Sequence, residues 1–170
     1  MKVLFSIIII LSTSLYGFEM YRKLLNRKKI LFSWIDLLRR IDLEVKYHKS
    51  SLPLIFKRLA KDLQGPISEF CLNISEALTK KEKILNDIWH EEINNLSVKY
   101  SLTKDDVKLL TQLGSFIGSY SSEEQTVQIN KVVLTLEGHY KKAEENVTKY
   151  RPIYQYGSIL LGILIVILIV

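Results

Sequence analysis

Hydrophobic residues follow two patterns along the chain, uninterrupted at its two ends and periodic between them. Residues 3–18 and 153–170 carry no charged side chain and consist mostly of Ile, Leu, Val and Phe. A helix that crosses the hydrocarbon core of a membrane needs about 20 apolar residues, within a range of about 17–25. The pattern therefore predicts transmembrane anchors at residues 1–21 and 152–170, around a body of residues 22–151.

Each terminal segment has a competing interpretation. The first resembles a cleaved signal peptide with Lys2 as its basic start, and the second resembles a buried core helix. A retained anchor is favoured for the first because a basic run follows it directly, as in a stop-transfer flank (Arg22, Lys23, Arg27, Lys28 and Lys29). A chain of 170 residues has no core that surrounds a helix apolar on every face, which favours a second anchor. A secreted or peripheral helical protein with a cleaved leader is the alternative.

The middle of the chain has the periodicity of α-helices. Within residues 24–47, apolar side chains recur at steps of three and four residues (Leu31, Trp34, Leu38, Ile41 and Val45). Turn and cap signals predict four further helices. The first is capped by Ser50 or Ser51, with Pro53 in its first turn, and the next two cover residues 67–78 and 82–96. Thr103 and Asp106 open the fourth as a capping box.

The last helix of the body has the clearest period. Its apolar positions form a heptad seam (Ile129, Val133, Leu136, Tyr140, Ala143, Val147 and Tyr150). The seam fits an antiparallel partner in the first helix of the same chain or a parallel second copy, and Pro152 predicts a kink or restart beyond it. The predicted fold class is all-α: a cytoplasmic bundle of about six helices, flanked by N- and C-terminal transmembrane helices.

The basic charge lies beside the membrane segments. The net charge is +6, with nine Lys/Arg against three Asp/Glu in residues 21–49, ten against twelve in 50–140, and four against two in 141–151. Lys and Arg beside a membrane segment stay in the cytoplasm. We therefore expect a cytoplasmic body with both termini on the opposite side, and no nucleic-acid partner. The expected membrane-interface anchors are Tyr16, Phe18, Tyr21, Arg22, Lys23, Tyr150, Arg151, Tyr154 and Tyr156.

The sequence offers no constellation for catalysis or metal binding. His48, His90 and His139 lie on different predicted elements, and Cys71 sits between Phe70 and Leu72, as a buried thiol does. The acidic pairs Asp105-Asp106 and Glu123-Glu124 fall at predicted helix starts, where they oppose the helix dipole. We expect no enzyme, cofactor or metal, and a scaffold that binds other proteins. A small membrane enzyme with an unrecognised site is the competing hypothesis.

Several local patterns resemble one protein family. They are Gly17-Phe18-Glu19-Met20, Leu43-Glu44-Val45-Lys46-Tyr47 followed by Ser50-Ser51-Leu52-Pro53, Leu113-Gly114-Ser115-Phe116-Ile117-Gly118 followed by Gln125, and Lys149-Tyr150-Arg151 through Tyr156-Gly157. Together they resemble the stage III sporulation protein AB family over the whole chain. The family's soluble bundle is similar to the cytoplasmic domain of the type II secretion platform protein.

The resemblance implies a function and partners. It implies a membrane platform subunit of the channel complex between mother cell and forespore, lying in the mother-cell membrane that faces the forespore. It also implies docking of a cytoplasmic secretion-type ATPase, the stage III sporulation protein AA, besides other channel subunits, membrane lipid and a possible homo-oligomer. Candidate positions for a partner or packing interface are Glu44, Gly114, Gly118 and Gln125. We expect the two glycines to pack against the last helix or to face a partner.

Small residues also recur four apart in both terminal segments. Thr13 and Gly17 form one such pair, and Ser158 and Gly162 form the other. This spacing pairs helices in membranes. The sequence leaves open whether the anchors pair within one chain or between two chains.

Overall fold

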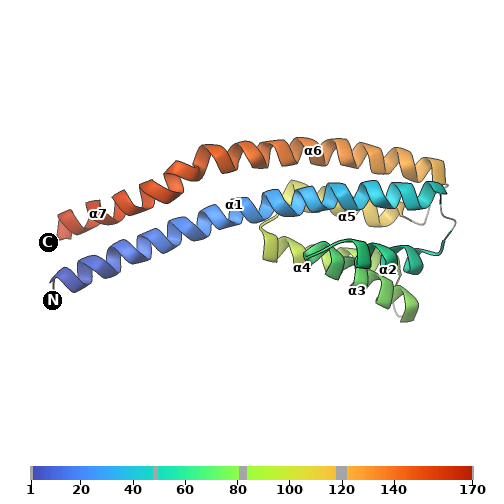
Figure 1. Ribbon diagram of the computed structural model, residues 1–170, viewed down its shortest axis with the longest axis horizontal. Coiled ribbons are helices and arrows are strands. Elements are labelled where there is room, and N and C mark those ends of the chain that lie inside the picture. The colour runs from blue at the N-terminus through green and yellow to red at the C-terminus, as the bar shows by residue number, and fades with distance from the viewer. Residues whose placement is uncertain (1, 48–49, 81–83, 118–121, 170) are drawn as a thin grey trace. The chain divides into compact units, whose positions relative to one another are not determined.

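The computed structural model describes residues 2–47, 50–80, 84–117 and 122–169, and in these residues it contains helices and no strand (Figure 1). The elements in order are α1 (Lys2–Tyr47), α2 (Leu52–Asp62), α3 (Pro66–Lys80), α4 (Leu85–Tyr100), α5 (Lys104–Phe116), α6 (Ser122–Pro152), the π-helix η1 (Ile153–Gly157) and α7 (Ser158–Ile169). The all-α prediction is confirmed. Two of these helices are long and apolar enough to cross a membrane, one at each end of the chain.

The chain divides into two compact units, to which α1 and α6 both contribute. The anchor unit comprises Met1–Lys28 and Lys141–Val170, and the body comprises Lys29–Tyr140. In the body, α1 lies between α6 on one side and the group of α2, α3 and α4 on the other (Figure 1). Its buried residues include the predicted stripe from Leu31 to Ile41, because apolar side chains three and four apart share one face of a helix.

An aromatic cluster forms the centre of the body. The indole of Trp89 on α4 lies with its centroid 4.9 Å from Phe70 of α3, 5.9 Å from Trp34 of α1 and 6.1 Å from Phe56 of α2. All four side chains are buried. The Nε1 of Trp89 donates a hydrogen bond of 2.8 Å to the carbonyl oxygen of Leu110 on α5, which satisfies the one polar atom of the indole. Trp89 therefore joins four other helices.

The heptad seam of α6 packs against α1 of the same chain. In the body, the rings of Tyr140 and Phe32 lie 5.9 Å apart, and Glu137 pairs with Arg39 at 2.6 Å. The later residue on α1, Arg39, pairs with the earlier residue on α6, Glu137, so the two helices run antiparallel. The expectation of an intramolecular, antiparallel partner is thus met.

Local cap signals had mixed outcomes. The capping box that opens α5 is present, with Thr103 Oγ1 accepting from the N–H of Asp106 and Asp106 Oδ2 accepting from the N–H of Thr103. The N-cap of α2 at Ser51, with Pro53 in the first turn, is confirmed by position, but the side-chain hydrogen bond expected of a cap is missing. Ser50 Oγ accepts a hydrogen bond from Arg58. The fourth helix begins at Leu85 and ends at Tyr100, later at both ends than predicted.

Pro152 marks a change of helix type. α6 ends at Pro152 and passes directly into the five-residue π-helix η1, which is followed by α7. Proline has no N–H to donate to the preceding turn, which favours such a departure from regular α-helix. The predicted disturbance at Pro152 is therefore a π-helical turn.

Two helical glycines provide a matched test of the core. A Cβ at Gly114 of α5 would lie 2.8 Å from Cδ1 of Trp89, whereas a Cβ at Gly138 of α6 would meet nothing within 4 Å. We expect Gly114→Ala to lower the free energy of unfolding by about 1–3 kcal/mol through overpacking. Gly138→Ala should raise it by roughly 0.5–1 kcal/mol, since alanine loses less backbone entropy in a helix. Denaturant unfolding of the full chain in detergent, followed by circular dichroism, measures both. Equal effects would contradict the assignment of Gly114 to the Trp89 contact.

Candidate functional site: paired anchors and the surface of the body

The four predicted interface positions have different environments. Glu44 on α1 is mostly buried, and its Oε2 lies 3.2 Å from Nη1 of Arg58 on α2, so it forms an ion pair inside the bundle. Gln125 is buried near the start of α6. Gly114 packs against Trp89 of α4, so the expected contact with the last helix was wrong there. Gly118 lies outside the described residues.

The two anchors pair with each other through their small residues. A Cβ at Gly17 of α1 would collide with the carbonyl oxygen of Tyr154 and with Ser158, and a Cβ at Gly162 of α7 would collide with Thr13 and lie 3.0 Å from Cα of Ile10. Each glycine therefore faces the small polar residue of the other anchor. Gly17 and Gly162 are both buried, although large apolar side chains around them are exposed.

The hydroxyl groups in this contact bond to the backbone of their own helices. Ser158 Oγ donates to the carbonyl oxygen of Tyr154 at 2.7 Å, and Thr13 Oγ1 donates to that of Ile10 at 3.0 Å. A hydroxyl satisfied in this way costs little in a hydrocarbon environment. The question that the sequence left open has a structural answer: in this chain the anchors pair intramolecularly. Lys28 and Glu144, 2.7 Å apart, continue the same antiparallel register beyond the apolar segments.

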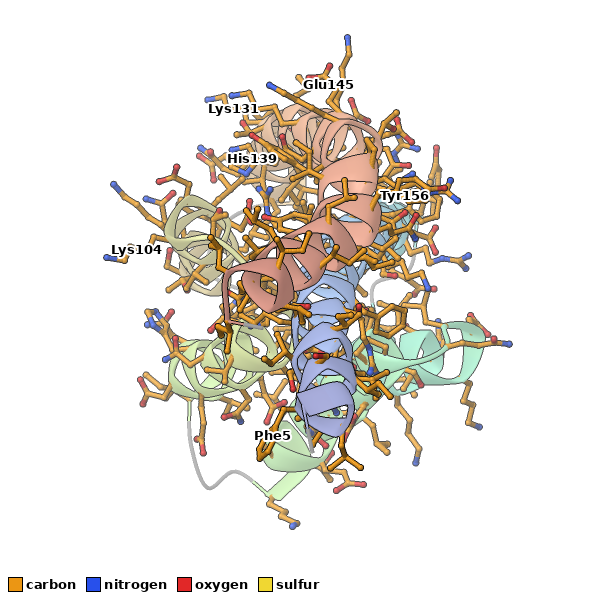
Figure 2. All side chains as sticks on the ribbon, turned by 90° about the vertical axis from the view of Figure 1, so that its left-hand side faces the viewer. Phe5, Lys104, Lys131, His139, Glu145 and Tyr156 are labelled. Carbon is orange, nitrogen blue, oxygen red and sulfur yellow. The ribbon has the colours of Figure 1, made fainter. Side chains whose placement is uncertain are left out.

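Aromatic and basic residues surround the place where the apolar segments end. The exposed fraction is 66% for Tyr16, 59% for Phe18 and 67% for Tyr156. Figure 2, viewed from the end that holds both termini, shows Tyr156 directed away from its helix. The rings of Tyr150 and Tyr154 lie 6.1 Å apart, and the ammonium group of Lys149 lies 5.6 Å from the ring centre of Tyr150.

Potentially reactive groups are held in structural roles. Cys71 is fully buried, and burial raises the pKa of its thiol to about 12, so it is neither a thiolate nor accessible at neutral pH. Asp106, also fully buried, accepts the cap hydrogen bond and lies 2.7 Å from Nδ1 of His139, which ties α5 to α6. Sequence analysis missed this pair, which is separated by 33 residues. Among the described residues, no group of three or more His, Cys, Asp or Glu side chains could hold a metal ion.

An open groove lies between α4 and α5. It has a volume of about 600 Å³, and its lining residues are His90, Asn94, Ser97, Leu102, Lys104, Val107, Lys108, Thr111 and Gln112. Lys104, Lys108 and His90 are exposed at its rim, while Leu102 and Val107 are half-buried. Lys104 extends away from α5 (Figure 2). The groove thus offers basic groups around a partly apolar floor.

Comparison with known proteins places these features in one family. Residues 2–170 match the sequence model of a family described as stage III sporulation protein AB. The chain is 24% identical, over 99% of both sequences, to the stage III sporulation protein AB of Bacillus subtilis (strain 168). It also resembles a solved structure of a stage III sporulation protein AB, with a TM-score of 0.65, 22% identity, and coverage of 72% of this chain and 96% of that one. The family resemblance drawn from the sequence motifs is confirmed.

The anchor contact can be tested by cross-linking. We expect Lys28→Cys with Glu144→Cys, in a Cys71→Ala background, to form an intramolecular cross-link with a short bifunctional maleimide. Gly17→Leu with Gly162→Leu should reduce this cross-link several-fold, because both added side chains collide with the opposite anchor.

Gly157→Leu is the matched control. A Cβ at Gly157 would approach only Ile153 of its own helix, at 3.9 Å, so cross-linking should be unchanged. Electrophoresis under denaturing conditions separates intramolecular from intermolecular products. A predominantly dimeric product in the unmodified anchor background would contradict the intramolecular pairing.

Proposed function

The chain belongs to the stage III sporulation protein AB family, and on that premise we propose that it is a non-enzymatic platform subunit of a sporulation channel between mother cell and forespore. In this proposal it docks a cytoplasmic secretion-type ATPase, the stage III sporulation protein AA, beside other channel subunits. A sporulation role follows from the family. The observation that carries the rest of the proposal is the paired membrane anchor joined to a helical body.

In the proposed mechanism, the two anchors hold the body in a defined orientation at the membrane. A body held at a membrane by two helices has less freedom to rotate than one held by a single anchor, so its surfaces keep a defined orientation toward soluble partners. The reactive groups already described are buried or paired within the body, which agrees with a scaffold. The family is not a known enzyme family.

The groove between α4 and α5 is our candidate for the docking face. Its exposed Lys104, Lys108 and His90 suit an acidic partner surface, and its half-buried Leu102 and Val107 suit an apolar side chain at the centre of the contact. Glu44, Gly114 and Gln125 are buried or mostly buried, so in this proposal they support the bundle and do not touch the partner. Gly118 stays a candidate on sequence grounds alone.

We further propose that the body lies in the cytoplasm and both termini on the opposite side. The basic residues beside the anchors support this orientation. The aromatic side chains of Tyr16, Phe18, Tyr21, Tyr150, Tyr154 and Tyr156 then lie at the headgroup level. Arg22, Lys23 and Arg151 complete the cytoplasmic interface.

Thiol labelling tests this orientation. Val98 is 87% exposed on α4, and the native Cys71 is buried, so Val98→Cys provides one accessible thiol in the body. In non-sporulating cells that carry the chain in the plasma membrane, we expect a membrane-impermeant maleimide to label it only after the cells are permeabilised. Labelling in intact cells, with a cytoplasmic marker protein unlabelled, would reverse the proposed topology.

ATPase binding by the full chain in neutral-lipid nanodiscs tests the docking proposal. Lys108→Glu places a like charge opposite the expected acidic surface, so we expect the affinity for the purified ATPase to fall roughly tenfold or more. Lys131→Glu makes the same charge change at an exposed position of α6 outside the groove and should leave the affinity unchanged (Figure 2).

The outcomes are distinct. No binding by the unmodified chain in an assay that detects micromolar complexes would contradict ATPase docking itself. Equal losses in both variants would place the contact outside the groove. Circular dichroism of each variant confirms that the helical content is retained.

A further inference from the structure

We propose that four basic side chains where the anchors leave the membrane form a binding collar for the phosphate groups of anionic phospholipids. The collar consists of Arg22 and Lys23 on α1 with Lys149 and Arg151 on α6. This is a binding function separate from ATPase docking. The ligands that we expect at the collar are lipid headgroups at the membrane surface.

The antiparallel pairing brings these four residues to one level along the helix pair. Gly17 packs against Tyr154 and Ser158. Arg22 follows Gly17 by five residues, and Lys149 precedes Tyr154 by five, in the opposite chain direction. At a rise of about 1.5 Å per residue, both lie about 7.5 Å beyond this contact, on the side away from the termini. The collar therefore begins where the uncharged segments end.

All four side chains are exposed, and their charge exceeds that of the two exposed carboxylates one turn away, Glu19 on α1 and Glu145 on α6. No carboxylate within the described ranges forms an ion pair with any of them. The guanidinium Nε of Arg151 donates to Gln155 Oε1 at 3.3 Å, and Lys149 lies over the ring of Tyr150, both neutral partners. Lys28 differs, because it is neutralised by Glu144. Four cations at one level repel each other, and an anion beside them relieves that repulsion.

The surroundings indicate that this anion belongs to a lipid. Below the collar and the exposed Glu19, the exposed surface is apolar and aromatic, with Leu15, Tyr16 and Phe18 on α1 and Ile153 and Tyr156 on the other anchor. Acyl chains cover such a surface, and the glycerol and phosphate groups of the same lipids then reach the collar. A soluble anion would contact the basic side chains of the collar and leave the apolar surface below them uncovered.

The experiment uses the full chain in nonionic detergent micelles, with bound phosphatidylglycerol and phosphatidylcholine counted by native mass spectrometry. We expect preferential binding of phosphatidylglycerol. Each Lys or Arg near an anionic surface contributes roughly a fivefold gain in affinity. The double variants R22Q/K23Q and K149Q/R151Q should therefore each weaken phosphatidylglycerol binding about 25-fold, with phosphatidylcholine binding unchanged.

The matched control is K57Q/K61Q, which removes two exposed lysines from α2 in the body. It should leave phosphatidylglycerol binding intact. Equal losses in the control and the collar variants would mean attraction to net charge and would overturn the proposal. Equal binding of both lipids by the unmodified chain would overturn it as well.

Two further outcomes separate other ligands. Displacement of phosphatidylglycerol by inorganic phosphate at matched concentration would assign the collar to a free anion and overturn the lipid proposal. Loss of ATPase capture in collar variants that keep their lipid binding would assign the collar to a protein partner, with the same consequence. The lipid measurement contains no ATPase, so its result is independent of the docking proposal. Circular dichroism verifies that every variant keeps its helices.

Discussion

The contact made by Trp89 is the constraint on which the body depends. Its indole meets aromatic rings from α1, α2 and α3, and its Nε1 bonds to a carbonyl oxygen of α5. Gly114 then leaves the space that lets α5 approach the same ring. Short amphipathic helices such as α2 and α3 gain most of their stability from tertiary packing. A single buried indole that touches four neighbours therefore determines how closely the helices assemble around α4.

The anchors are held by a different kind of contact. Inside a membrane, apolar surface gives no hydrophobic driving force between helices, so close backbone approach and satisfied polar groups take its place. Gly17 opposite Ser158 and Gly162 opposite Thr13 provide that approach. The chain thus combines large aromatic side chains in the body with the smallest side chains in the membrane segments, and each choice suits its solvent. Both contacts fix the surfaces around them, as the proposed scaffold function requires.

Features encoded within a few residues were predictable from the sequence. The apolar ends, the heptad seam of α6 and the capping box at Thr103 and Asp106 depend on local spacing, and the structure contains each of them. Features that join distant segments were not. The neighbour of Gly114 is set by how α4 and α5 pack, and the contact of Asp106 with His139 spans 33 residues. Ser51 is the N-cap residue that its type favours, but its side chain makes no cap hydrogen bond, and its carbonyl oxygen accepts from the N–H groups of Leu54 and Ile55.

The π-helix after Pro152 shifts by one residue the positions of the chain that face α1. The heptad spacing of α6, continued through Tyr150 and Tyr154, would next direct Gly157 and Leu161 toward α1. The wider turn of η1 accommodates one additional residue, and Ser158 and Gly162 take those places. A soluble seam built on large side chains can thereby continue into a membrane seam built on small ones. If this turn became regular α-helix with no residue removed, the anchor would rotate by roughly 100° and present Leu161 where Gly162 now fits.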